Sequence, residues 1–88
     1  MSPLVRRYPA LATLPRASLG QFPSPIERIV HASLRGDLWV KRDDLNADAF
    51  GGNKVRTLEW LLGGLIAGDK VLTVGGEGST HVLATAEH

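Results

Sequence analysis

The sequence GGNKVRTLE, residues 51–59, follows a strand-like stretch, LWVKRDDL, at residues 38–45. Two adjacent glycines make a tight turn in which the backbone can approach a ligand closely. A helical pattern begins after them with Lys54 in its first turn, although the helix dipole favours anions at that end. The positive helix end disfavours the ammonium form, so the neutral amine that attacks aldehydes becomes easier to reach. The stretch therefore predicts a functional lysine beside a glycine turn.

Residues 38–88 have the order of elements of an α/β fold. A helix is expected from residue 53 to about 63, because apolar side chains recur on one face: Val55, Leu58, Leu61, Leu62 and Leu65. The apolar run VLTV at 71–74 is typical of a buried parallel strand. A second glycine turn, GGEG at 75–78, precedes another predicted helix. These elements predict a parallel sheet flanked by helices, with both glycine turns at strand ends, where ligands bind.

The N-terminal 25 residues differ in composition from the rest. They contain all five prolines, which predicts an extended or looping leader with a short helical turn near residues 10–14. PIERI at 25–29 could start a strand. We therefore divide the chain into a proline-rich leader, 1–25, and an α/β portion, 26–88. Residues 82–88 have a helical composition without a glycine or proline stop, which predicts truncation at the C-terminus; a fraying terminal helix in a complete small protein is the alternative.

Composition excludes several function classes. The formal charge of +1 argues against a nucleic-acid partner. The chain has no cysteine, so it has no disulfide framework and no thiolate metal site, and a reducing, cytoplasmic setting is compatible with this. No stretch approaches the ~20 apolar residues that span a membrane, and the N-terminus lacks the unbroken apolar region of a signal peptide.

Three strings together carry a resemblance: KRDD at 41–44, GGNKVRTLE at 51–59 and GGEGSTH at 75–81. They resemble the 1-aminocyclopropane-1-carboxylate deaminase / D-cysteine desulfhydrase family, whose enzymes depend on pyridoxal 5'-phosphate (PLP). The resemblance runs from about residue 25 to 88; its middle string is specific and its last is looser. It implies the N-terminal part of a two-domain fold of the tryptophan-synthase-β type. It also implies a full-length parent that is a homo-oligomer.

In this resemblance Lys54 is the catalytic lysine that would hold PLP as a Schiff base. Asn53 and Thr57 would bind the cofactor beside it. The residues alone leave other interpretations open, because Lys54 could be a solvated helix lysine and Asn53 a helix N-cap. Arg56 could pair with Glu59 three residues later. The family commonly has a lysine where Thr57 stands, so a hydroxyl replaces a charge near the expected cofactor phosphate.

Ser79, Thr80 and His81 match the family segment that binds the substrate carboxylate. The resemblance implies that all three contact the substrate, that Ser79 also acts in catalysis, and that Thr80 also binds the cofactor. A helix N-terminus preceded by glycines suits an anion. A plain Ser/Thr helix cap and a polar surface histidine are the alternatives. Thr80 replaces the asparagine of the family, and Leu83 stands where an arginine is common.

Two further patterns are weak. The spacing G-x-G-x-x-G fails because position 81 is histidine, so no dinucleotide site is predicted. Residues 42–44, RDD, bring two carboxylates together, but such neighbours are typical of a solvated turn, and no metal site is predicted.

The resemblance implies the N-terminal part of a PLP-dependent lyase or deaminase. It would act on a small amino-acid substrate and release ammonia and a 2-oxo acid. The main phosphate loop and the partner of the pyridine nitrogen would lie beyond His88, so the 88-residue chain alone is expected to be inactive. One alternative is a non-catalytic module that binds a phosphate-bearing ligand through backbone N–H groups. A truncated remnant without its own function is another.

Overall fold

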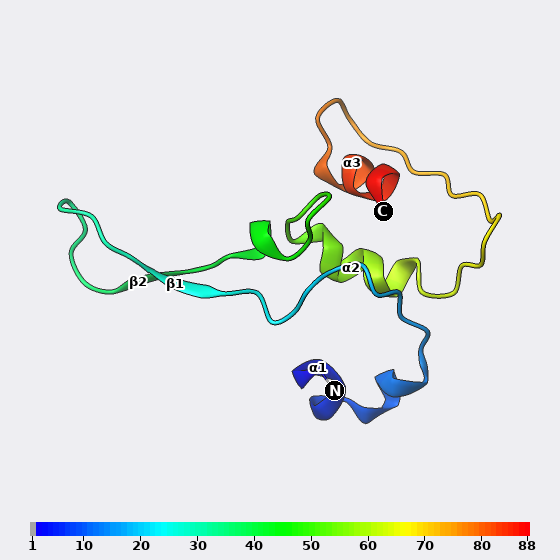
Figure 1. Cartoon of the computed structure of the whole chain (residues 1–88), viewed down its shortest axis with the longest axis horizontal. Coiled ribbons are helices and arrows are strands. Elements are labelled where there is room, and N and C mark those ends of the chain that lie inside the picture. The colour runs from blue at the N-terminus through cyan, green and yellow to red at the C-terminus, as the bar shows by residue number, and fades with distance from the viewer. Residues whose placement is uncertain (1) are drawn as a thin grey trace.

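The computed structural model describes residues 2–88 and shows an open arrangement of short elements (Figure 1). Its radius of gyration is 16.0 Å, whereas a compact domain of this length has a value of about 12 Å. The chain therefore has a small centre from which arms extend. In chain order the elements are α1 (Pro3–Arg7), the 3-10 turn η1 (Pro9–Thr13), β1 (Ile26–Ile29), β2 (Leu38–Lys41), the 3-10 turn η2 (Asp43–Leu45), α2 (Lys54–Leu61) and α3 (Thr80–Glu87).

Strands β1 and β2 form an antiparallel hairpin, in which Ile26 is opposite Lys41 and Ile29 is opposite Leu38. Both strands were expected from their β-favouring residues, and those two predictions are confirmed. The hairpin extends away from the helices (Figure 1). Almost all of its side chains are exposed, because no other layer covers either face.

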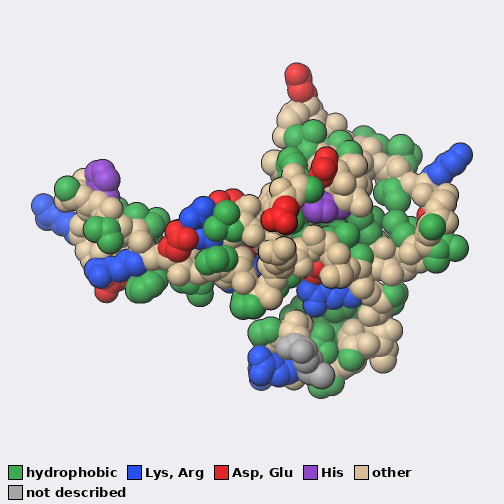
Figure 2. All heavy atoms as spheres, in the orientation of Figure 1, with side chains coloured by type: hydrophobic (Ala, Val, Ile, Leu, Met, Phe, Trp, Pro, Cys, Tyr) green, Lys and Arg blue, Asp and Glu red, His purple; other side chains and the backbone are tan. Residues whose placement is uncertain are grey.

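The prediction of a parallel sheet is wrong for the part of the chain that the structure describes. Residues 71–74 form no strand, and the side chains of Leu72 and Val74 are 91% and 85% exposed. A strand needs a neighbour with which to exchange hydrogen bonds, and the sheet of residues 2–88 contains only β1 and β2. Residues 65–76 instead form a long loop around the outside, with hydrophobic side chains on its surface (Figures 1 and 2).

The helical predictions are confirmed, with one addition. Helix α2 covers most of the expected range 53–63, and α3 follows the second glycine turn. The turn η1 corresponds to the short helical turn expected near residues 10–14. Helix α1 is the addition, in a leader that was expected to be extended or looping. It forms because Pro3 suits the first helical position and the hydroxyl of Ser2 accepts from the N–H of Val5 at 3.3 Å.

The core lies where α2 packs against α3. Its buried apolar residues are few: Ala47, Val55, Leu58 and Ala84. Three polar residues are also buried, namely Ser24, Asn46 and Glu59. A core this small supplies little hydrophobic stabilisation, so the hydrogen bonds of these three residues carry much of the local organisation. No helix within residues 2–88 has the length and apolar content needed to cross a membrane.

Candidate functional site

Lys54 is the first residue of α2 and directly follows the glycine turn. Its side chain is half-buried and, within residues 2–88, forms no hydrogen bond or ion pair. Asn53 occupies the N-cap position, but its backbone is helical and its side chain makes no capping hydrogen bond. The expectation of Asn53 as an N-cap is therefore correct in position only. The amine of Lys54 is left without a carboxylate partner among residues 2–88.

The glycine turn is held by the residues just after β2. The N–H of Gly52 donates to the carbonyl of Asp43 at 2.7 Å and to Oδ1 of Asn46 at 3.1 Å. A Cβ on Gly51 would lie 2.2 Å from the carbonyl oxygen of Asp44. Gly52 has φ +131°, which L side chains rarely adopt. Within residues 2–88, the close approach that this glycine turn permits is therefore between two segments of the protein backbone, and not between the backbone and a ligand.

Arg56 lies in the first turn of α2 and pairs with Asp43. Its Nε and Nη2 donate to the two carboxylate oxygens at 3.0 and 2.8 Å, and Ser24 Oγ also donates to this carboxylate, at 2.5 Å. The hydrogen bonds from Arg56 and then Ser24 lower the pKa of Asp43 from 3.8 to about 2. The guanidinium of Arg56 also lies 4.5 Å from the ring centre of Phe22. The alternative that paired Arg56 with Glu59 is therefore wrong.

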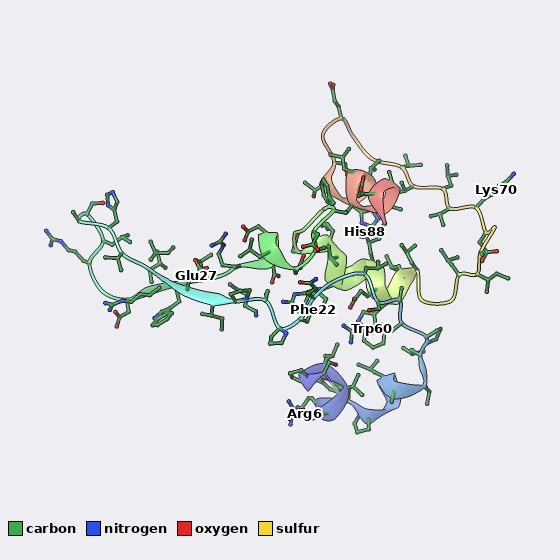
Figure 3. All side chains as sticks on the ribbon, in the orientation of Figure 1. Arg6, Phe22, Glu27, Trp60, Lys70 and His88 are labelled. Carbon is green, nitrogen blue, oxygen red and sulfur yellow. The ribbon has the colours of Figure 1, made fainter. Side chains whose placement is uncertain are left out.

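Glu59 is 2% exposed and holds the leader against α2. Its Oε1 accepts from Nε of Arg16 at 2.9 Å, and its Oε2 accepts from the N–H groups of Leu19 and Gly20 at 3.0 and 3.1 Å. Burial raises the pKa of Glu59, but the hydrogen bonds from Arg16, Gly20 and Leu19 outweigh it, so the pKa is lowered overall. Arg16 also lies over the ring of Trp60, which faces α1 (Figure 3).

The second glycine turn leads into α3, and Ser79 caps that helix. Its Oγ accepts from the N–H of Val82 at 3.4 Å. A Cβ on Gly75 would lie 2.9 Å from Ser79 Oγ, so the glycine lets this hydroxyl pack against the turn. Thr80 is exposed and His81 is half-buried. The prediction of Ser79 as a helix cap is thus confirmed. The catalytic and binding roles of Ser79, Thr80 and His81 stay predictions.

Two cavities within residues 2–88 border α2, with volumes of about 920 Å³ and 330 Å³. Neither of them is lined by Lys54 or by residues 79–81, so neither brings the predicted cofactor and substrate residues together. Thr57 is exposed and lines the smaller one. Within residues 2–88 no parallel sheet holds both glycine turns at one edge. The ring of His88 lies between α3 and α2 (Figure 3), with Nε2 2.9 Å from the carbonyl oxygen of Phe50.

Sequence reasoning did not single out Asn46, Ser24 or the long-range role of Glu59. Asn46 stands in a polar loop and Ser24 in the proline-rich leader, so neither position differed from an ordinary surface residue. Glu59 was assigned to a local pair because its partners are about 40 residues away. Only knowledge of that long-range contact would have identified the role of Glu59.

No family model and no solved structure matches this chain. Several curated proteins do match it. The bifunctional D-cysteine desulfhydrase/1-aminocyclopropane-1-carboxylate deaminase of Arabidopsis thaliana is 42% identical over 73 residues, which cover 78% of this chain and 18% of the relative. The nocardicin C-9' epimerase of Nocardia uniformis is 44% identical over 80 residues, 89% of this chain and 24% of the relative.

The D-cysteine desulfhydrase of Salmonella paratyphi B is 38% identical over 80 residues, 86% of this chain and 24% of the relative. The chain thus spans about a quarter of the length of the curated relatives it matches. The identities extend over most of the chain, well beyond the motif at residues 51–59.

Proposed function

Because this chain is homologous to the 1-aminocyclopropane-1-carboxylate deaminase / D-cysteine desulfhydrase family over most of its length, we propose that it is the N-terminal part of a PLP-dependent enzyme. The parent enzyme acts on a small amino acid, as a deaminase or desulfhydrase that releases ammonia and a 2-oxo acid. The homologous family is PLP-dependent, whereas cofactor binding by this chain is part of the proposal. We also propose a homo-oligomeric parent and a cytoplasmic location.

The observation that carries the proposal is the setting of Lys54. The side chain begins a helix, is half-buried and has no carboxylate partner within residues 2–88. An amine that no carboxylate within residues 2–88 holds is available to react with an aldehyde. The setting of Lys54 therefore fits a cofactor that is held through an aldehyde group.

Each predicted residue has a role in this proposal. Lys54 holds the cofactor and moves a proton at its Nζ, while Asn53 and Thr57 bind the cofactor beside it. Ser79 and His81 contact the substrate, and Thr80 contacts both cofactor and substrate. Bound PLP supplies an electron sink for the substrate carbon. Thr57 offers a hydroxyl and no charge, so it contributes less to phosphate binding than a lysine would.

The fold of the parent also belongs to the proposal. The exposed apolar side chains of residues 71–74 need a covering that residues 2–88 do not provide. We propose that this segment is a strand of a parallel sheet in the parent enzyme. Pairing of that strand would place the second glycine turn at the carboxyl edge of the sheet, where the first turn would also lie.

A second reaction class follows from one comparison. The Nocardia uniformis relative is named an epimerase. Epimerisation and elimination can both begin with removal of a proton from the substrate α-carbon, and the two differ in the later fate of the carbon. Racemisation of an amino acid without ammonia release would favour this second candidate.

The test is covalent trapping of PLP on the full chain by borohydride, followed by peptide mass spectrometry. We expect an adduct on the peptide that contains Lys54, and its loss in Lys54→Ala. Lys70→Ala is the matched control, because Lys70 extends outward from the loop between α2 and α3 (Figure 3). An undiminished adduct in Lys54→Ala would contradict the proposal. Binding of a phosphate-bearing ligand without any adduct would support the non-catalytic module instead.

A further inference from the structure

Asn46 is the one fully buried amide side chain described in residues 2–88, and it holds Gly52 at two points. Its Nδ2 donates to the carbonyl of Gly52 at 2.9 Å, and its Oδ1 accepts from the N–H of the same residue at 3.1 Å. Two hydrogen bonds to the same residue require a donor and an acceptor in one plane, and an amide side chain supplies both.

Gly52, the residue held by Asn46, lies two positions before α2, which starts at Lys54. The carbonyl of Gly52 also accepts from the N–H of Val55, at 3.3 Å, in the first turn of the helix. Lys54 lies between these two residues. The backbone just before Lys54 is therefore held by Asn46, which forms no hydrogen bond with the Lys54 side chain within residues 2–88.

Asn46 is itself fixed from the other side. Its carbonyl accepts from the N–H of Gln21 at 2.6 Å, and its N–H donates to the carbonyl of Asp43 at 3.3 Å. A Cβ on Gly20 would lie 2.8 Å from the carbonyl oxygen of Asn46, so the leader packs closely on this residue. The leader and η2 thus meet the backbone of Asn46, while the glycine turn meets its side chain.

We propose that Asn46 is a positioning residue that sets where the amine of Lys54 lies and thereby how fast that amine captures an aldehyde cofactor. The inference rests on the proposed role of Lys54. A purely structural Asn46 would affect stability alone. A positioning Asn46 affects the reactivity of Lys54 relative to other lysines of the same molecule.

The test compares the borohydride-trapped labelling of Lys54 and Lys70 by PLP in the full chain. The Lys54/Lys70 ratio cancels differences in reagent and protein concentration. Asn46→Asp keeps the shape and the acceptor but replaces the donor with a second oxygen facing the Gly52 carbonyl. We expect the ratio to fall about five- to tenfold, the factor that corresponds to losing one buried hydrogen bond. Asn46→Ser also loses a bond but places no second oxygen against the Gly52 carbonyl, so its fall should lie at the lower end of this range.

The matched control is Leu58→Ala, which removes buried apolar atoms of α2 without touching the glycine turn. The ratio should stay at the wild-type value in this variant, because its turn contacts remain. An equal fall in Leu58→Ala and in both Asn46 variants would overturn the inference, since loss of stability alone would then explain it. An unchanged ratio in Asn46→Asp and Asn46→Ser would also overturn it.

Failure of the proposed function gives a different result. If the wild-type chain labels Lys54 no faster than Lys70, then no positioned amine exists, and both proposals fail. If the wild type prefers Lys54 and the Asn46 variants keep that preference, only the positioning role fails. Amide hydrogen exchange at Gly52, measured in the same variants, reports whether the hydrogen bond from the Gly52 N–H to residue 46 was broken.

Discussion

Nε of Arg16 donates a hydrogen bond of 2.9 Å to Oε1 of Glu59, across a separation of 43 residues in the sequence. This contact joins the leader to the helix that carries Lys54. Because Glu59 is buried and also receives two backbone N–H groups of the leader, its carboxylate is a structural centre of the chain. The helix that begins at Lys54 is therefore held at its start by Asn46 and in its second turn by Glu59.

Glu59→Ala is expected to destabilise the chain strongly. The change leaves the half-buried N–H groups of Leu19 and Gly20 without their acceptor, and a hydrogen bond to a charged group contributes ~1.5–3 kcal/mol. We expect the free energy of unfolding to fall by about 3 kcal/mol. Urea unfolding followed by tryptophan fluorescence checks this, because Trp60 lies under Arg16.

Glu77→Ala is the control for that measurement, since Glu77 is exposed and its side chain has no hydrogen bond within residues 2–88. Its unfolding midpoint should match the wild type. Equal midpoints for both variants would show that the leader is not held by Glu59.

Gly51→Ala is expected to disrupt the glycine turn. The added Cβ would lie 2.2 Å from the carbonyl oxygen of Asp44, so the backbone must move. Forced repacking of this kind costs about 1–3 kcal/mol. Gly76→Ala is the matched control, because a Cβ there meets nothing within 4 Å. Thermal unfolding should separate the two variants, and equal melting temperatures would argue against a close approach at Gly51.

Asp43 should make the chain sensitive to acid. Its pKa is lowered from 3.8 to about 2 in the folded chain, chiefly by the hydrogen bond from Arg56. The unfolded chain therefore binds the proton first as the pH falls. The stabilisation is complete above pH 3.8 and is lost as the pH falls towards 2.

Asp43→Asn removes this contribution, so its stability should fall less than that of the wild type between about pH 4 and 2. Unfolding curves at several pH values measure the difference. Asp48→Asn serves as the control, because Asp48 is exposed and its side chain has no hydrogen bond within residues 2–88. A wild type and an Asp43→Asn variant with parallel pH profiles would contradict the assignment.

Residues 71–74 should exchange their amide protons rapidly in the 88-residue chain. None of their N–H groups donates a backbone hydrogen bond within residues 2–88, whereas the N–H of Leu62 donates to Leu58 at 2.8 Å. Hydrogen exchange measured by NMR should therefore show protection at Leu62 and none at Leu72. In a longer parent protein the same amides should become protected, and continued rapid exchange there would argue against a strand.

The 88-residue chain alone should show little or no deamination of amino acids. The two cavities beside α2 contain neither Lys54 nor residues 79–81, so cofactor and substrate would not be enclosed together. Ammonia release from D-cysteine and from 1-aminocyclopropane-1-carboxylate measures this. Robust turnover by the purified chain would contradict the expectation.

The elements that local patterns encode were predictable from the sequence. Residues 38–41 form a strand and residues 54–61 a helix because alternation and a 3.6-residue stripe need only neighbouring residues. The parallel sheet was not obtained, because a strand needs a neighbouring strand and residues 71–74 pair with none within residues 2–88. The antiparallel pairing of β1 with β2 was also not predicted, since the loop of residues 30–37 lacks the short turn that usually reveals a hairpin.

The candidate site shows the same division. The position of Lys54 after a glycine turn follows from residues next to one another, and the structure agrees. The partners of Arg56 and Glu59 do not follow, because helical spacing indicates a local pair while the buried contacts come from η2 and the leader. The two hydrogen bonds between Asn46 and Gly52 depend on the path of the loop between these residues, and no periodic sequence pattern describes that path.

The attachment of residues 16–20 to α2 determines where this protein can be shortened or extended. A proline-rich N-terminus is often the first segment removed when a protein is prepared for crystallisation. Here a deletion through Gln21 would leave the Glu59 carboxylate without any of its hydrogen-bond donors from the leader. The hairpin loop at residues 30–37 is exposed throughout. An affinity sequence or a fluorophore inserted there should leave the start of α2 undisturbed.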